Sequence, residues 1–269
     1  MAITKKRKTG SRKRSVVAAA PKTASASPEL GRLQAVIFDV EGTLVDSMFP
    51  TLLCWQEILR DYAFDFSTAE LHRFSGLGGD DMLSCLLPTG VSPTIRKEMV
   101  SRHDDRYKTK YLPTVTPLPG TAAMLEGLKA ADLQIALATT CDRETLDPYL
   151  TLIGCPASLF DAIASGDDAD RTKPDPQLLN IALRRLSLRA SPRILGVGDT
   201  PYDAEAAVSC GITPVGVLTG YFSRPDLVAA GCDTVCKDAV SLALMIPAPA
   251  SGKAASDQQP AQPSAHSHS

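Results

Sequence analysis

Short apolar runs alternate with amphipathic segments along most of this chain. The runs are closed by polar residues or glycine, as expected of strands that are buried on both faces of a sheet. They lie at residues 35–38, 133–139, 160–165, 193–197, 213–217 and 234–236. Apolar residues recur at helical spacing over 121–131, 143–153, 176–186, 202–210, 225–230 and 239–245. This alternation predicts an α/β fold, a Rossmann-like parallel sheet with helices on both faces.

One long segment interrupts the alternation between the first two predicted strands. Its apolar residues keep helical spacing in four stretches, 52–59, 69–74, 82–87 and 92–107. A loop between a strand and its helix is usually about two to six residues long, so this segment is an insertion. We predict an all-helical cap domain at 47–115, inserted into an α/β core formed by residues 31–46 and 116–246. The glycine-rich turn at 75–79 is expected to be a cap loop that contacts a small substrate.

Both ends of the chain lack a periodic apolar pattern, and we expect them to be disordered. Residues 1–30 form a basic tail with eight Lys or Arg and one acidic residue, whereas 247–269 are rich in Pro, Ala, Ser and Gln. The basic tail is compatible with a solvated arm, with a nuclear-localisation-like signal or weak contact with nucleic acid, and less so with a transit peptide. Residues 31–246 carry 19 basic and 28 acidic side chains, so the folded body is not expected to bind nucleic acid.

The composition is that of a globular protein with an ample core: 269 residues, 44% hydrophobic and 22% charged. The seven cysteines form no C-x-x-C pair, which favours reduced thiols over a disulfide framework. No apolar run reaches the roughly 20 residues needed to cross a bilayer, and no secretory pattern is found. We therefore expect a cytoplasmic protein without a membrane partner.

Polar residues that could take part in catalysis or binding lie where predicted strands end or a helix begins. Asp39 closes the first strand, Thr139 closes the second, and Lys173 precedes a helix. Asp199 and Asp203 follow the strand that ends at residue 197. Because the carboxyl ends of parallel strands lie at one edge of the sheet, we expect these side chains to come together there.

Such a set of residues suits phosphoryl chemistry. The carboxylates of Asp39, Asp199 and Asp203 would repel one another unless a cation lay between them. Mg²⁺ prefers hard oxygen ligands of this kind. Lys173 would add a further positive charge, and hydrogen bonds from Thr139 would stabilise the oxygens of the transferred group.

The order strand–Asp, strand–Thr, Lys before a helix, strand–Asp-x-x-x-Asp resembles the haloacid dehalogenase (HAD) superfamily over about residues 33–245. A helical cap directly after the first motif is similar to that of the phosphoglycolate-phosphatase-like subfamily. The resemblance implies a Mg²⁺-dependent phosphatase that hydrolyses a small phosphate monoester through a phospho-aspartate on Asp39. Its partner would be a small phosphorylated metabolite, and the sequence gives no indication of oligomeric state.

The resemblance also implies roles for individual residues, with Asp39 as the nucleophile and Glu41 as the general acid and base. The implied catalytic residues are Asp39, Glu41, Thr139 and Lys173. The implied substrate-binding residues are Gly42, Thr43, Thr139, Thr140 and Lys173. The implied metal ligands are Asp39, Glu41 through its backbone carbonyl, Asp199 and Asp203.

Glu41 departs from the family pattern, because the hydrolytic members normally carry aspartate two positions after the nucleophile. A glutamate keeps the carboxyl group but is longer by one C–C bond, and a displacement near 1 Å can cost about 10²-fold in rate. A second hypothesis is therefore a HAD-fold binding or regulatory protein with weak catalysis. The presence of Asp39, Lys173, Asp199 and Asp203 together favours an active enzyme.

A third hypothesis is a phosphotransferase like β-phosphoglucomutase. Trp55 stands where such mutases carry a tryptophan. Thr51 and Gly79, however, stand where they place a histidine and a phosphate-binding arginine. The loss of both disfavours retention of a bisphosphate intermediate.

Overall fold

The computed structural model describes residues 33–246, and its centre is a six-stranded sheet in which every neighbouring pair is parallel. The order is β5-β4-β1-β6-β7-β8. The strands are β1 (Ala35–Phe38), β4 (Gln134–Ala138), β5 (Ala162–Ala164), β6 (Ile194–Gly198), β7 (Thr213–Val217) and β8 (Thr234–Cys236). The fold predicted for the sheet is confirmed.

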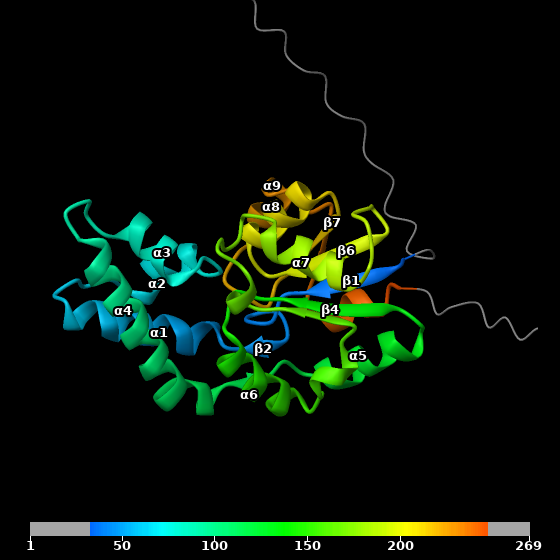
Figure 1. Ribbon diagram of the computed structural model, residues 1–269, viewed down its shortest axis with the longest axis horizontal. Helices are drawn as coiled ribbons and strands as arrows, with labels where there is room; N and C mark the ends of the chain where they lie inside the picture. Colours follow the sequence, from blue (N-terminus) through cyan, green and yellow to red (C-terminus); the bar gives the residue numbers. More distant parts are fainter. Residues whose placement is uncertain (1–32, 247–269) are drawn as a thin grey trace, which may run out of the picture.

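Helices cover both faces of this sheet because its strands are apolar on both sides (Figure 1). In β1, Val36 and Phe38 pack in one cluster while Ala35 and Ile37 pack in the other. The first face is covered by α5 (Thr121–Ala130), α6 (Arg143–Ile153) and α10 (Ala239–Ala243). The second is covered by α7 (Gln177–Arg185) and α8 (Pro201–Cys210), and α9 (Arg224–Ala229) packs beside α8.

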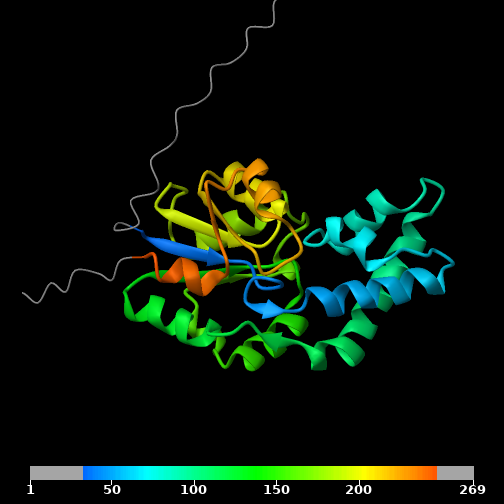
Figure 2. The same cartoon turned by 180° about the vertical axis from the view of Figure 1, so that it is seen from behind.

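The segment between β1 and β4 is helical and lies to one side of the sheet (Figures 1 and 2). It contains α1 (Met48–Asp61), α2 (Thr68–Leu71), α3 (Gly79–Leu86) and α4 (Pro93–Arg106), then a π-helical turn at Tyr107–Tyr111. These helices share an apolar core of their own that includes Leu52, Trp55, Ile58, Leu83 and Met99. We call residues 48–114 the helical insertion.

Two short strands mark the entrance and exit of the helical insertion, and the sequence did not predict them. β2 (Val45–Asp46) pairs antiparallel with β3 (Thr116–Pro117). The Leu118 N–H donates to the Leu44 carbonyl at 3.0 Å, which extends the pairing of β2 and β3 by one residue on each strand. The two crossings, the chain segments that enter and leave the helical insertion, therefore lie side by side.

The edge strand β5 is shorter than the predicted strand at 160–165. At Asp161 the contact with β4 is only partly a ladder contact: the Asp161 N–H donates to the Ile135 carbonyl at 2.8 Å, but the Ile135 N–H donates to the Asp161 carboxylate at 2.9 Å. At the other end, Ser165 donates its N–H to the Asp168 carboxylate at 3.0 Å and starts a 3₁₀ turn. Side-chain hydrogen bonds of this kind compete with the strand ladder and shorten it.

The predicted tails, 1–30 and 247–269, lie outside the described residues, as do residues 31 and 32 of the predicted core. Within residues 33–246, no helix combines the length and apolar character that a membrane crossing needs.

We predict that Leu125→Ala lowers the free energy of unfolding by about 2–5 kcal/mol, because Leu125 on α5 is fully buried and its loss leaves a cavity. Chemical denaturation measures this change. The matched control is Leu152→Ala on α6, which is 40% exposed and should change stability by no more than about 0.5 kcal/mol. Equal effects of the two substitutions would contradict the assignment of α5 to the core.

Candidate active site

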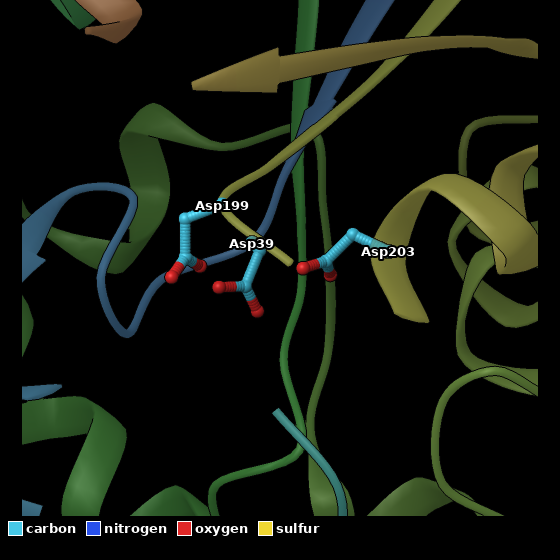
Figure 3. Close-up of side chains that lie close together, drawn as sticks. All are labelled: Asp39, Asp199 and Asp203. Carbon is cyan, nitrogen blue, oxygen red and sulfur yellow. The ribbon is translucent and has the colours of Figure 1, made fainter. Parts of the chain in front are cut away.

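Three aspartates from the carboxyl edge of the sheet point into one space (Figure 3). Asp39 follows β1, Asp199 follows β6, and Asp203 lies in the first turn of α8. One carboxylate oxygen of each lies within 4.8 Å of the others. The Asp39 N–H donates to the Val197 carbonyl at 2.9 Å, so the two central strands hold the nucleophile candidate at their shared end.

Lys173 lies between two of these aspartates and is itself buried. Its Nζ is 2.5 Å from Asp39 Oδ1 and 2.6 Å from Asp203 Oδ1. Although burial opposes a charged amine, the negative charges of Asp203 and Asp39 raise the pKa of Lys173 above its usual range. The lysine is therefore a permanent positive charge beside Asp39.

The carboxylates resist being charged together. Burial raises the pKa of Asp39 to about 6, with Lys173 lowering it and Asp203 raising it further. Burial, and then the charges of Asp203 and Asp39, raise the pKa of Asp199 well above its usual value. One lysine does not balance three buried aspartates, so a further cation would relieve their repulsion.

Asp199 occupies a cradle made by two glycines. A Cβ atom added to either Gly42 or Gly220 would collide with the Asp199 carboxylate. Gly42 also has a φ of +74°, which strains any residue with a side chain. Thr219, next to Gly220, donates its hydroxyl to the Gly42 carbonyl at 2.5 Å and ties the two turns together.

The donors fit Mg²⁺. Asp199 Oδ2 is buried and has no hydrogen-bond partner among the described residues, although it lies in an acidic cluster. Buried polar atoms are almost always paired, so this oxygen is suited to a ligand. Carboxylate oxygens from Asp39, Asp199 and Asp203 are the hard donors that Mg²⁺ prefers.

Asp203 is fixed by the start of α8. Thr200 donates its hydroxyl to Asp203 Oδ2 at 2.6 Å, and the Asp203 N–H donates back to the Thr200 hydroxyl at 3.2 Å. This capping box leaves Asp203 Oδ1 for Lys173. Thr200 was not singled out from the sequence, although Thr-x-x-Asp before a helix is a recognisable capping pattern.

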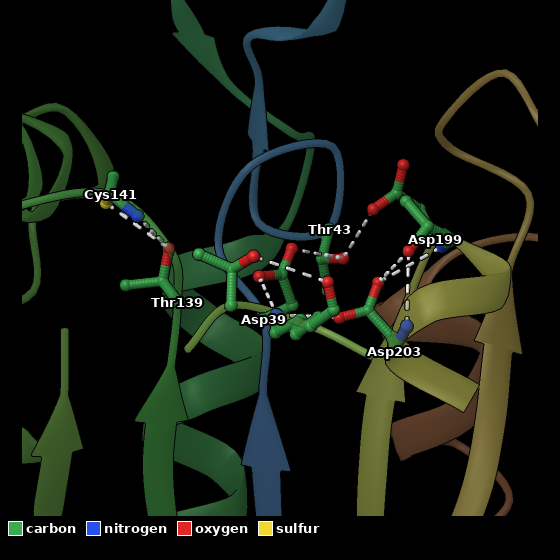
Figure 4. Close-up of polar contacts among 9 residues, drawn as sticks. Asp39, Thr43, Thr139, Cys141, Asp199 and Asp203 are labelled. Atoms are coloured by element: carbon green, nitrogen blue, oxygen red, sulfur yellow. Dashed lines mark hydrogen bonds and ion pairs between the residues drawn. The ribbon is translucent and has the colours of Figure 1, made fainter. Parts of the chain in front are cut away.

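Thr43 lies between Asp39 and Asp199 (Figure 4). Its hydroxyl is 3.3 Å from Asp39 Oδ2 and 3.3 Å from Asp199 Oδ1. In this arrangement the side chain predicted to bind substrate links two carboxylates.

The two threonines after β4 lie in different surroundings. Thr139 is fully buried, and its hydroxyl accepts from the Cys141 N–H at 3.3 Å and lies 3.2 Å from Cys141 Sγ (Figure 4). Thr140, rather than Thr139, lines the cavity in front of Asp39. Cys141 is half-buried, and desolvation raises the pKa of its thiol well above its usual value, which disfavours the thiolate.

Glu41 extends toward a pair of tyrosines that sequence reasoning missed. Tyr149 on α6 donates its hydroxyl to Glu41 Oε1 at 2.9 Å, and the hydroxyls of Tyr149 and Tyr107 are 2.5 Å apart. Burial and the charge of Asp39 raise the pKa of Glu41 to about 7, while the Tyr149 hydrogen bond opposes this rise. Tyr149 stands 108 positions away from Glu41 in an ordinary apolar helix pattern, so no motif pointed to it.

The helical insertion covers the aspartates and closes a cavity of about 60 Å³. The Gly78 N–H donates to the Thr172 hydroxyl at 3.3 Å, and this hydroxyl donates to Asp81 at 2.5 Å. Tyr202 on α8 donates to the Arg73 carbonyl at 2.8 Å. The glycine-rich turn predicted to face a substrate does line the cavity, through Ser75, Gly76 and Leu77.

Comparisons with known proteins agree with this architecture. The sequence model of the family described as haloacid dehalogenase-like hydrolase matches residues 36–217. Pyrophosphatase PpaX of Bacillus velezensis is 30% identical over 187 residues, 69% of this chain and 83% of the relative. A phosphoglycolate phosphatase of Rhodobacter capsulatus is 27% identical over 199 residues, 71% of this chain and 87% of the relative.

A solved structure gives the same result. A hydrolase from Pseudomonas syringae superposes with a TM-score of 0.74 at 27% identity, covering 79% of this chain and 97% of that one. The family resemblance carried by the four motifs is confirmed, and the chain belongs to the haloacid dehalogenase-like hydrolases.

Proposed function

We propose that the protein is a Mg²⁺-dependent phosphatase that hydrolyses a small phosphate monoester through a phospho-aspartate on Asp39. The observation that carries the proposal is the buried Asp39 carboxylate beside Lys173, with the carboxylates of Asp199 and Asp203 within 4.8 Å. Relatives named as phosphoglycolate phosphatase and pyrophosphatase support phosphoryl transfer as the chemistry.

The reaction would proceed in two displacements at phosphorus. In the first, an Asp39 oxygen bonds to phosphorus while the ester P–O bond breaks, and Glu41 gives its proton to the leaving alkoxide. In the second, Glu41 takes a proton from water, the water oxygen bonds to phosphorus, and the bond to Asp39 breaks. Phosphate leaves and the Asp39 carboxylate is restored.

The remaining residues would hold charge and geometry. Mg²⁺, held by Asp39, Asp199, Asp203 and the Glu41 backbone carbonyl, would supply positive charge to the phosphoryl oxygens. Lys173 would neutralise Asp39 and a phosphoryl oxygen. Thr140, which lines the cavity, would donate a hydrogen bond to these oxygens, whereas the Thr139 and Thr43 hydroxyls are engaged with Cys141 and with the aspartates.

The longer side chain at position 41 is compatible with this chemistry because Tyr149 holds it. Its carboxylate has a fixed hydrogen-bond donor at 2.9 Å, which restricts where the acid can lie. This contact supports an active enzyme over a binding protein with weak catalysis. The mutase hypothesis gains no support, because no basic residue of the helical insertion lines the cavity within residues 33–246.

We predict that Asp39→Asn lowers Mg²⁺-dependent phosphate release by at least about 10³-fold, because the nucleophile is lost. A screen of phosphate esters with Mg²⁺ measures this rate, and chelation by EDTA should abolish it until Mg²⁺ is restored. Asp105→Asn, at an exposed position of α4, is the matched control and should retain full activity. Phosphate release that does not exceed the Asp39→Asn background would favour the binding hypothesis.

We predict that Gly220→Ala raises the Mg²⁺ concentration for half-maximal activity about tenfold or more, because the new methyl group displaces the Asp199 carboxylate. Titration of activity with Mg²⁺ measures this shift. Gly127→Ala is the matched control, since a Cβ there meets nothing within 4 Å. An unchanged Mg²⁺ requirement in Gly220→Ala would argue against Asp199 as a metal ligand.

We predict that Tyr149→Phe lowers kcat/KM for alkyl phosphates about tenfold, because a hydrogen bond to a carboxylate contributes about 1.5–3 kcal/mol. The kcat/KM for aryl phosphates should fall less, since their leaving groups need little help from a proton donor. Tyr62→Phe, which removes a surface hydrogen bond to Glu98, is the control. Equal losses for alkyl and aryl esters would mean that Tyr149 only supports the fold.

A further inference from the structure

The helical insertion forms an uncharged wall opposite the aspartates. Its residues in the cavity lining are Met48, Thr51, Leu52, Trp55, Phe74, Ser75, Gly76, Leu77 and Met82. Trp55 is held in this wall by stacking on His103, with ring centres 3.9 Å apart. A leaving group of the ester would lie against this wall, because the phosphoryl group must face Asp39.

The polar groups of the wall do not supply positive charge. Thr51 donates its hydroxyl to the Ser47 carbonyl at 2.9 Å, and Ser75 donates to the His72 carbonyl at 2.5 Å. Both hydroxyl protons are therefore already engaged, and what these groups offer the cavity is an oxygen that accepts.

Arg73 and Lys108, two basic residues of the helical insertion, are engaged away from the cavity. Within residues 33–246, Lys173 is the only basic residue in the lining, and it pairs with Asp39 and Asp203. Arg73 is exposed, with its guanidinium 5.0 Å from the centre of the Phe74 ring. Lys108 forms ion pairs with Asp142 and Glu144 on the side of the core.

The charge balance of the cavity disfavours a second anionic group on the substrate. Four acidic residues, Asp39, Glu41, Asp199 and Asp203, line it against one lysine. A bound Mg²⁺ would offset the charge of the aspartates and of the phosphoryl group. A carboxylate or second phosphate on the leaving group would then be buried against apolar atoms without a counter-charge, which is strongly unfavourable.

We infer that the substrate is a phosphate monoester of a compact, uncharged alcohol, without a carboxylate or a second phosphate on its leaving group. The cavity of about 60 Å³ limits the size of this alcohol. The inference rests on the proposed function and adds the class of substrate to it. It separates this chain from the relatives named for phosphoglycolate and pyrophosphate, whose leaving groups carry negative charge.

The test compares kcat/KM of the full-length protein with Mg²⁺ for ethyl phosphate, 2-phosphoglycolate and pyrophosphate. We expect ethyl phosphate to be preferred by at least about tenfold, because an unpaired buried charge is costly. Chemical reactivity alone gives the opposite order, since the two charged substrates have the better leaving groups. A kcat/KM for 2-phosphoglycolate or pyrophosphate that equals or exceeds that for ethyl phosphate would overturn the inference.

A substitution in the wall tests the cause of this order. Leu77 is half-buried in the glycine-rich turn, and Leu77→Arg would place a cation in the lining. We expect the ratio of kcat/KM for 2-phosphoglycolate to that for ethyl phosphate to rise about tenfold, as a desolvated charge regains a partner. Leu77→Gln is the control for size and polarity and should leave the ratio unchanged. An equal ratio in both variants would contradict the charge argument, and the wild-type order remains decisive if Leu77→Arg fails to fold.

Binding separates this inference from the proposed function. Calorimetry of Asp39→Asn with Mg²⁺ should show tighter binding of ethyl phosphate than of 2-phosphoglycolate, without any turnover. This order of binding in a protein whose wild type hydrolyses no ester would support the inference and contradict only the proposed function. Tighter binding of 2-phosphoglycolate would overturn the inference even if the wild type is an active phosphatase.

Discussion

The mutual repulsion of three buried carboxylates is the constraint around which this structure is arranged. Asp39, Asp199 and Asp203 lie within 4.8 Å of one another, and Lys173 compensates only part of their charge. A parallel sheet brings these groups together because its strands all end at the same edge. The fold thus holds an electrostatically unfavourable cluster, whose repulsion a bound cation would relieve.

The glutamate at position 41 is held by contacts from two parts of the molecule. Tyr149 comes from α6 of the core, whereas Tyr107 comes from the π-helical turn at the end of the insertion. Their hydroxyls, 2.5 Å apart, link Glu41 to both parts of the molecule. The position of the acid therefore depends on contacts that a motif centred on Asp39 does not contain.

The sequence predicted the sheet and its helices well because apolar periodicity is a local property. Asp39 and Asp199 could be placed together since each directly follows a buried strand. Tyr149 could not be predicted as a partner of Glu41, because their contact depends on how α6 packs and not on any spacing. Likewise, only the three-dimensional course of the chain after β4 shows that Thr140 lines the cavity while Thr139 bonds to Cys141.

The paired strands β2 and β3 have a mechanical consequence. Any rotation of the helical insertion must twist both crossings at once, because they are hydrogen-bonded to each other. β2 begins only three residues after Gly42, whose turn supports the Asp199 carboxylate. In the proposed enzyme, a rotation of the helical insertion that admits an ester would therefore move the Gly42 turn beside the Asp199 carboxylate, and the exchange of product would be coupled to how tightly a cation is coordinated.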